Sequence, residues 1–214
     1  VPDADGEGAR GLLADVREGW AEVRTRRWLL FGAIAEGFYS LIVVPAIVVL
    51  GPILAKRELG GAGAWGAIDA CFGLGLLLGG LVLLRWRPRR LLVAGYLSLV
   101  LFLPHFALLA EVGPVWLIAV ATVPAGACAS VWQALWETTM QQEVPPERLS
   151  RASSLATLGF YALFPVGFAL VGPLSELIGL RGAFWLANAC VLGNIVAVLA
   201  LPEARAIVRR PAVA

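Results

Sequence analysis

Two carboxyl groups lie deep inside apolar stretches of this chain, and they are the side chains best placed to carry chemistry. Glu36 and Asp69 are each flanked on both sides by uncharged residues. An acid is costly in hydrocarbon and is by default a functional candidate there. A carboxyl group that takes up a proton on one side of a membrane and releases it on the other can couple transport to a proton gradient. Glu36 and Asp69 are therefore proton-coupling candidates; the alternative is a structural acid bonded to a neighbouring helix or exposed at a rim.

Polar and aromatic residues near these acids are candidates to line a cavity. Tyr39 and Ser40 follow Glu36 at i+3 and i+4, so all three share one face of a helix. An aromatic ring with a polar tip suits a binding cavity, although interface packing alone also explains each tryptophan. The candidates for a substrate cavity are Tyr39, Ser40, Ser130, Trp132, Gln133, Trp136 and Tyr161.

One apolar stretch carries a stripe of small and polar residues. Its members, three or four positions apart, are Thr122, Gly126, Ser130, Gln133 and Glu137. Residues with this spacing stay on one side of a helix. We therefore expect one continuous hydrophilic face that is turned away from lipid.

The composition places the whole chain in a membrane. Hydrophobic residues make up 59% of the 214 residues and charged residues only 15%, which is far too apolar for a soluble domain. Six apolar stretches are long enough to cross about 30 Å of hydrocarbon as helices. They are residues 28–50, 64–84, 91–110, 114–136, 155–177 and 183–201. We predict an all-α polytopic membrane protein whose six-helix transmembrane bundle covers residues 28–202.

The basic residues indicate the orientation of these helices. With the N-terminus placed inside, all of the 17 Lys and Arg residues except Lys56, Arg57 and Arg181 fall on the inner side. Cytoplasmic loops of membrane proteins carry such an excess. We expect an integral protein of the plasma (inner) membrane with both termini in the cytoplasm.

The segments outside the bundle have their own character. Residues 1–9 are small and acidic, which predicts a flexible tail or linker. Residues 10–27 show helical periodicity and are typical of an amphipathic helix that lies on the inner membrane surface or packs on other protein. Residues 203–214 are expected to form a basic cytoplasmic tail.

Residues 132–154 are expected to contain the central cytoplasmic loop. Pro145 and Pro146 cannot continue a helix, so the preceding span should stop near Gln142. Three serines between positions 150 and 154 are expected to cap the next helix. The candidates for a cytoplasmic gate or loop are Arg87, Arg89, Arg90, Glu137, Glu147 and Arg151.

Other residues have structural interpretations. Gly75 and Gly79 form a GxxxG pattern that lets another helix approach closely. The three cysteines lie in different spans, without disulfide or metal spacing, and are interpreted as small packing residues. His105, the only histidine, is assigned a packing or lipid-side position in preference to a proton relay.

Three spans followed by three of opposite orientation form the inverted repeat of secondary transporters. Two motifs accompany this order: QxxVPxExLxR between Gln141 and Arg151, and GPLxExxGxR between Gly172 and Arg181. With the basic turn after the second span, they make the chain resemble the C-terminal half of a major facilitator superfamily transporter. The similarity is to the drug and siderophore efflux group, which includes enterobactin exporter-like and macrolide efflux-like proteins. The chain departs from that pattern at Ser150, where glycine is common, and in its basic turn, which lacks an acidic residue.

The resemblance implies a function. The six spans would correspond to helices seven to twelve: the first and fourth would line a central cavity, the second and fifth would form a moving interface, and the third and sixth would face lipid. The implied activity is proton-coupled export of a hydrophobic or amphipathic small molecule by alternating access. The partners would be the bilayer and a missing six-helix half or a second copy, with no nucleic acid.

Two alternatives remain beside transport. The first is a truncated or non-transporting scaffold or regulatory subunit that keeps the fold. The second, an intramembrane enzyme, is disfavoured because one histidine and no metal-ligand cluster, GxSxG motif or phosphate loop leave too few groups for catalysis. No cofactor or metal is expected.

Overall fold

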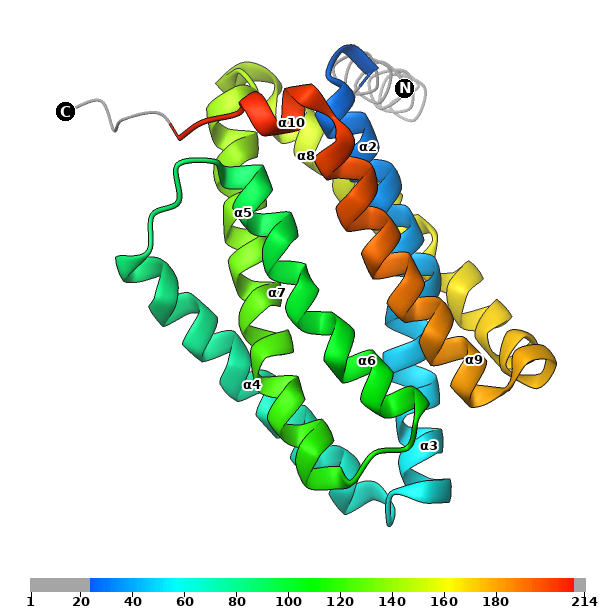
Figure 1. Ribbon diagram of the computed structural model, residues 1–214. Helices are drawn as coiled ribbons and strands as arrows, with labels where there is room; N and C mark the ends of the chain where they lie inside the picture. The colour runs from blue at the N-terminus through cyan, green and yellow to red at the C-terminus, as the bar shows by residue number, and fades with distance from the viewer. Residues whose placement is uncertain (1–23, 210–214) are drawn as a thin grey trace, which may run out of the picture.

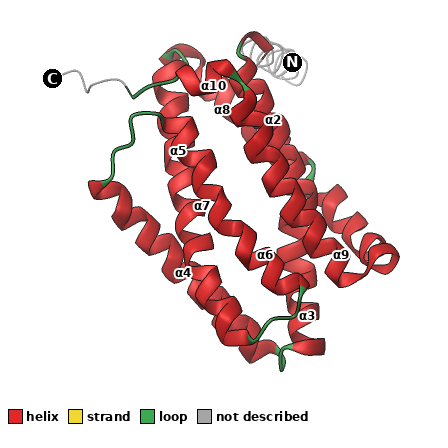
Figure 2. Ribbon diagram, viewed as in Figure 1, coloured by secondary structure: helices red, strands yellow, loops and turns green. Residues whose placement is uncertain are grey.

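A computed structural model describes residues 24–209 and shows an all-helical protein (Figures 1 and 2). Helices hold 89% of the described residues, and none of these residues lies in a strand. The predicted fold class is therefore confirmed at the level of an all-α protein. The interpretations of residues 1–9, most of 10–27 and 210–214 lie outside the described residues.

The helices follow one another with short connections. The first half contains α2 (Arg27–Phe38), two π-helical segments (Tyr39–Val43 and Ala46–Leu50), α3 (Gly51–Glu58), α4 (Ala62–Arg85), α5 (Leu91–Ser98), a 3₁₀ segment (Leu99–Phe102) and α6 (Leu103–Ala110). The second half contains α7 (Val115–Glu143), α8 (Pro146–Ala162), α9 (Phe164–Ala200) and α10 (Pro202–Ala206).

Five helical runs of the described chain are long and apolar enough to cross a membrane, which supports a multi-pass integral membrane protein. They are Arg27–Glu58, Ala62–Arg85, Leu91–Ala110, Val115–Glu143 and Pro146–Ala200. The last run has 55 residues, and its helix is interrupted at Gly179, where φ is 74° and ψ is 166°. Figure 1 shows the chain turning back between the yellow and orange parts of this run.

The start of α2, residues 86–90, residues 144–145 and α10 gather at one end of the molecule (Figure 1). We call this the inner end, after the orientation that the basic residues predict, and the opposite end the outer end. At the outer end, an exposed ion pair of 2.7 Å joins Arg181 to Glu111. The Trp185 indole N–H donates to the same Glu111 oxygen at 3.0 Å.

The boundary between α7 and α8 confirms one expectation and corrects two. α7 ends at Glu143, one residue beyond the predicted stop. However, the connection consists only of Val144 and Pro145, so most of 132–154 is helix. The serines between 150 and 154 lie inside α8 and do not cap it, because Pro145 is the N-cap and Pro146 occupies the first helical turn. The fixed φ of proline is preorganised for that position.

Helices α4 and α7 approach each other through glycines. A Cβ atom added to Gly75 or Gly79 would collide with the α7 backbone, at Val123 and Ala127 respectively. A Cβ atom added to Gly126 would collide with the carbonyl oxygen of Phe72 in α4. The predicted GxxxG contact is thus confirmed, and Gly126 is its counterpart on α7.

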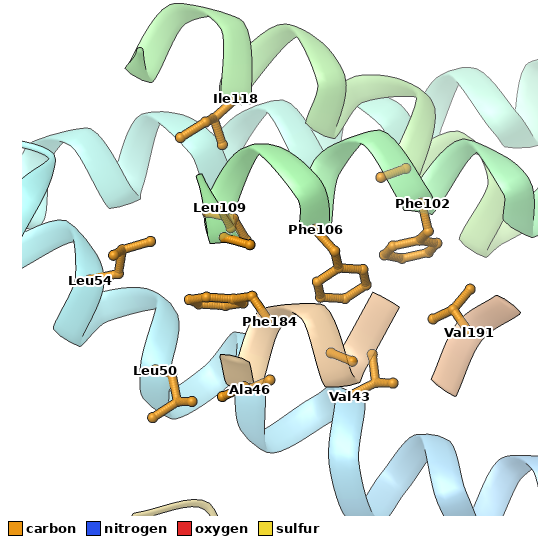
Figure 3. Packing of buried hydrophobic residues seen from close by; sticks show 14 of the residues in the cluster. Val43, Ala46, Leu50, Leu54, Phe102, Phe106, Leu109, Ile118, Phe184 and Val191 are labelled. Carbon is orange, nitrogen blue, oxygen red and sulfur yellow. The ribbon is translucent and has the colours of Figure 1, made fainter. Parts of the chain in front are cut away.

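Three apolar clusters among the described residues hold the bundle together, of which the smallest contains Leu91, Val131 and Leu135 and the other two are extensive. The larger lies towards the outer end, where Phe102 and Phe106 of the third span stack at 5.8 Å and pack with Phe184 of α9 (Figure 3). The smaller lies at the inner end around Trp28, Tyr96 and Trp136, and Ala204 and Ile207 of the C-terminal segment are buried in it. The cysteines pack within the bundle as expected: Cys128 is buried, and Cys71 and Cys190 are half-buried.

The α4–α7 contact predicts opposite effects for two adjacent glycines. Gly79→Ala should lower the free energy of unfolding by about 1–3 kcal/mol, because the two backbones must move apart. Gly80→Ala is the control, since nothing lies within 4 Å of its added Cβ atom; it should be neutral or stabilising by up to about 1 kcal/mol. Urea-induced or thermal unfolding in detergent micelles measures both. Equal effects would show that α4 and α7 are not closely packed.

Candidate functional site

A cavity opens between α2, α7 and α8 in the inner half of the bundle. Its volume is about 390 Å³, within the usual range for small-molecule sites. We call it the inner cavity. Its lining residues are Glu36, Trp132, Gln133, Trp136, Glu137, Met140, Gln141, Leu149, Ser153, Thr157, Phe160 and Tyr161.

Stacked indole rings form one wall of the inner cavity. The rings of Trp132 and Trp136 lie 5.9 Å apart and are nearly parallel, at 16°. Trp28 packs edge-on against Trp136, with ring centroids 5.8 Å apart. Gly32 makes this arrangement possible, because a Cβ atom there would collide with the Trp136 ring. The wall therefore offers a rigid aromatic surface at little cost in side-chain entropy.

The charged groups of the inner cavity are acidic. Glu36 and Glu137 are the charged residues in its described lining, which includes no Lys or Arg. The Gln133 amide donates a 2.6 Å hydrogen bond to the Glu137 carboxylate, so these two side chains are already paired on α7. Glu36 lies nine residues after the start of α2, about 14 Å along the helix axis at about 1.5 Å per residue. This is close to the middle of a hydrocarbon layer of about 30 Å.

The structure brings only some of the predicted cavity residues together. Trp132, Gln133, Trp136 and Tyr161 line the inner cavity with Glu36. Tyr39, Ser40 and Ser130 do not. The Ser40 hydroxyl is fully buried and donates to the Phe160 carbonyl oxygen at 2.6 Å. Tyr39 packs against the larger apolar cluster, and Ser130 faces Gly79 of α4. Tyr39 and Ser40 both lie at the start of a π-helical turn, where neighbouring spans pack against the helix in place of the cavity.

The polar stripe of α7 is divided among several neighbours. Thr122 contacts α6, Gly126 contacts α4, and Gln133 and Glu137 face the inner cavity. The expectation of one continuous hydrophilic face is therefore wrong. Because helices cross at an angle, a single face of α7 meets different partners along its length.

Two polar residues of α8, Ser153 and Thr157, line the inner cavity but were not among the predicted cavity residues. Together with the predicted Tyr161 they lie at i, i+4 and i+8, a spacing that places them on one helix face. Three polar side chains at this spacing are a signal that can be read from the sequence.

The gate candidates lie at the inner end. Arg87, Arg89 and Arg90 are exposed in the turn between α4 and α5, and the Arg89 carbonyl oxygen accepts a 2.7 Å hydrogen bond from the Arg209 backbone N–H. Glu147 and Arg151 are exposed on α8. The C-terminal segment, expected as a basic tail, is thus bonded to the basic turn through its described part.

A second cavity of about 240 Å³ lies in the outer half, between the first four helical runs. We call it the outer cavity. Asp69 lines it from α4, His105 from α6 and Thr122 from α7. The other lining residues are apolar or aromatic: Val44, Ile47, Val48, Trp65, Ile68, Phe72 and Phe102.

His105 is buried, with 3% of its surface exposed, and is held by a hydrogen bond to Thr122. Its Nδ1 lies 2.8 Å from the Thr122 hydroxyl oxygen. That hydroxyl donates to the Ile118 carbonyl oxygen at 2.7 Å. A hydroxyl has one hydrogen to donate, so both contacts are satisfied together when it donates to Ile118 and accepts Nδ1–H from the His105 ring. The expected packing position of His105 is confirmed, and Thr122 is the partner that the sequence did not reveal.

With this geometry described, comparison with other proteins adds no assignment. No protein-family model, characterised protein or solved structure matches the chain.

The Thr122 contact can be tested against a matched threonine. Thr122→Val should cost about 1–3 kcal/mol of unfolding free energy, because the buried Nδ1–H of His105 is left without an acceptor. Thr139→Val is the control: Thr139 is also fully buried, and its hydroxyl donates to the carbonyl oxygen four residues earlier, but to no other helix. Chemical unfolding in micelles compares them. A cost for Thr139→Val as large as that for Thr122→Val would contradict the contact.

Proposed function

We propose that this chain is one half of a secondary active transporter that exports a hydrophobic or amphipathic small molecule in exchange for protons. The observation that carries the proposal is the position of Glu36. A carboxyl group near the middle of the first span lines a cavity walled by two stacked indole rings. Such an intramembrane acid facing a cavity is typical of ion and substrate pathways.

The composition of the inner cavity supports this class of substrate. Indole and phenyl rings offer apolar contact, whereas Gln133, Gln141 and Thr157 offer hydrogen bonds. The lining carboxylates favour a neutral or cationic molecule over an anion, since like charges repel strongly at low dielectric constant. The cavity is open on one side, so a second six-helix half or a second copy of the chain would complete it.

The length of the last helical run supports six membrane crossings. At about 1.5 Å per residue, 55 residues would extend about 80 Å, more than twice the hydrocarbon thickness. The interruption at Gly179 divides the run into two helices of membrane-spanning length. We therefore propose six spans in a three-plus-three inverted repeat, as in one half of a major facilitator protein, with both termini in the cytoplasm.

This topology predicts that two sites on the last helical run are labelled from opposite sides of the membrane. In a variant with Cys71, Cys128 and Cys190 replaced by alanine, Ser150→Cys should react with an impermeant maleimide only from the cytoplasmic side. Leu177→Cys, whose parent side chain is 83% exposed, should react only from the outside. Intact cells and inverted vesicles provide the two sides. Labelling of both positions from one side would refute the sixth crossing.

Glu36 would act as the proton carrier in an alternating-access cycle. A protonated Glu36 is neutral and leaves the cavity attractive mainly to apolar groups. Loss of the proton restores a charge beside the indole wall and changes the affinity for a cationic or polar substrate. The proton and the substrate thereby compete for one cavity, which is the requirement for exchange transport.

The coupling role predicts that replacing Glu36 and replacing Glu137, two acids of the same cavity, affect export differently. With the chain co-reconstituted with its partner half, or as a dimer, a proton gradient should drive ethidium export. Glu36→Gln should reduce export to the rate without a gradient. Glu137→Gln is the control: it retains a hydrogen-bonding partner for Gln133 and should alter KM while leaving the dependence on the gradient intact.

The result distinguishes the possible roles. Gradient-driven export by Glu36→Gln would remove Glu36 from the mechanism. Absence of ethidium binding and transport by every assembly of the wild-type chain would favour a non-transporting scaffold.

A further inference from the structure

We propose that the outer cavity is a second ligand site, which binds a small organic ammonium ion with Asp69 as its counter-ion and His105 as a hydrogen-bond acceptor. The proposal goes beyond the transport function and does not depend on it. The tautomer of His105, the charge of the lining residues and the size of the cavity support it.

The hydrogen bonds of His105 determine what the ring presents to the cavity. With the Thr122 hydroxyl hydrogen on the Ile118 carbonyl oxygen, the hydrogen of the 2.8 Å bond between Thr122 and His105 is carried by Nδ1. In a neutral imidazole the other nitrogen, Nε2, then carries a lone pair and is an acceptor. The ring is one of the residues that line the outer cavity. A ligand that meets Nε2 must therefore donate a hydrogen bond.

Asp69 adds a negative charge to this acceptor. Asp69 is exposed, whereas His105 is buried. Asp69 therefore lies at the rim of the cavity, and His105 lies deeper inside it. Asp69 is the one formally charged residue in the described lining, which contains neither Lys nor Arg. Two acceptors and a single negative charge match a cation that carries N–H groups.

The remaining lining selects an organic cation. Trp65, Phe72 and Phe102 present aromatic rings, whose faces attract cations, and the other walls are aliphatic. A metal ion such as Na⁺ or Mg²⁺ prefers several oxygen ligands, and these walls supply few. A volume of about 240 Å³ lies below the range of about 300–1,000 Å³ for drug-sized ligands. The occupant is therefore small, such as an alkylammonium or arylmethylammonium ion.

The other ionisable groups around His105 do not compete with this assignment. On the α9 side of α6, Cys190 packs against the larger apolar cluster and Arg181 is paired with Glu111 at the outer end. On α7, the buried Cys128 thiol donates to the Ala125 carbonyl oxygen. Asp69 is thus the charged group that shares a cavity with the ring.

The single histidine allows a direct test by NMR. The full chain, with ¹⁵N-labelled histidine in lipid nanodiscs, is titrated with benzylammonium, and benzyl alcohol serves as the uncharged probe. We expect the neutral Nδ1–H tautomer in the free protein. Benzylammonium should shift the Nε2 resonance by donating a hydrogen bond to it. Benzyl alcohol should require at least about tenfold more ligand, since it lacks the charge that pairs with Asp69.

Three variants separate this site from the inner cavity. Asp69→Asn should raise the apparent Kd for benzylammonium about tenfold or more, through loss of a partly desolvated ion pair. Asp69 is exposed, so the packing should survive, and Asp69→Glu, which keeps the charge, should retain most of the affinity. In Glu36→Gln, the Nε2 resonance of His105 should shift at the same benzylammonium concentrations as in the wild type, whatever happens in the inner cavity.

Three results would overturn the proposal. The first is an Nε2–H tautomer in the free protein. The second is equal affinity of wild type and Asp69→Asn for benzylammonium. The third is protonation of His105 near neutral pH that depends on Asp69 and is unchanged by benzylammonium, which would make the outer cavity a proton site.

Discussion

No water inside hydrocarbon can satisfy a backbone carbonyl group, and this constraint decides how the polar residues of the bundle are used. Three polar side chains donate across the bundle to carbonyl oxygens where the helical form changes. Ser40 donates to Phe160, beside the α8–α9 junction. Asn188 donates to Leu103, where the 3₁₀ segment becomes α6. Asn194 donates to Ala35, shortly before α2 gives way to π-helix. Each bond is worth about 1 kcal/mol or less in a bilayer, but it fixes an irregular junction to another span.

The same constraint explains which features could be predicted from the sequence. Hydropathy and composition are enough to predict an all-helical membrane protein, because a spanning segment must be apolar and must satisfy its own backbone hydrogen bonds. Pro145 and Pro146 are enough to predict where α7 ends, since neither can continue a helix that precedes it. The helices extend beyond the apolar stretches, as α7 does from Trp136 to Glu143, because charged residues at the interface end a hydropathy window but not a helix.

The candidate site was harder to predict, for a geometric reason. The i+3 and i+4 rule places Tyr39 and Ser40 near the face of Glu36 but does not reveal their neighbours: Ser40 bonds α8, and Tyr39 packs in the larger apolar cluster. The stripe on α7 follows the rule, yet its members meet α4, α6 and a cavity in turn, because α7 crosses its neighbours. A single sequence gives the face of a residue but not the neighbour opposite that face. His105 and Thr122, 17 positions apart, could not be paired without the fold.

Helix α7 is the common wall of the two cavities, and the rigidity of its surroundings differs along its length. A Cβ atom at Gly75 or Gly79 of α4 would collide with the α7 backbone at Val123 or Ala127, so the two helices are in direct backbone contact there. In the inner half, the opposite wall is α8, in which Ala152 is the one fully buried side chain among those described. The far end of α8 is fastened, because Ser40 bonds Phe160 and Gly167 packs directly on the backbone of Leu41. The two cavities therefore share α7 but are completed by different helices: α2 and α8 for the inner cavity, and α4, the first span and the third span for the outer cavity.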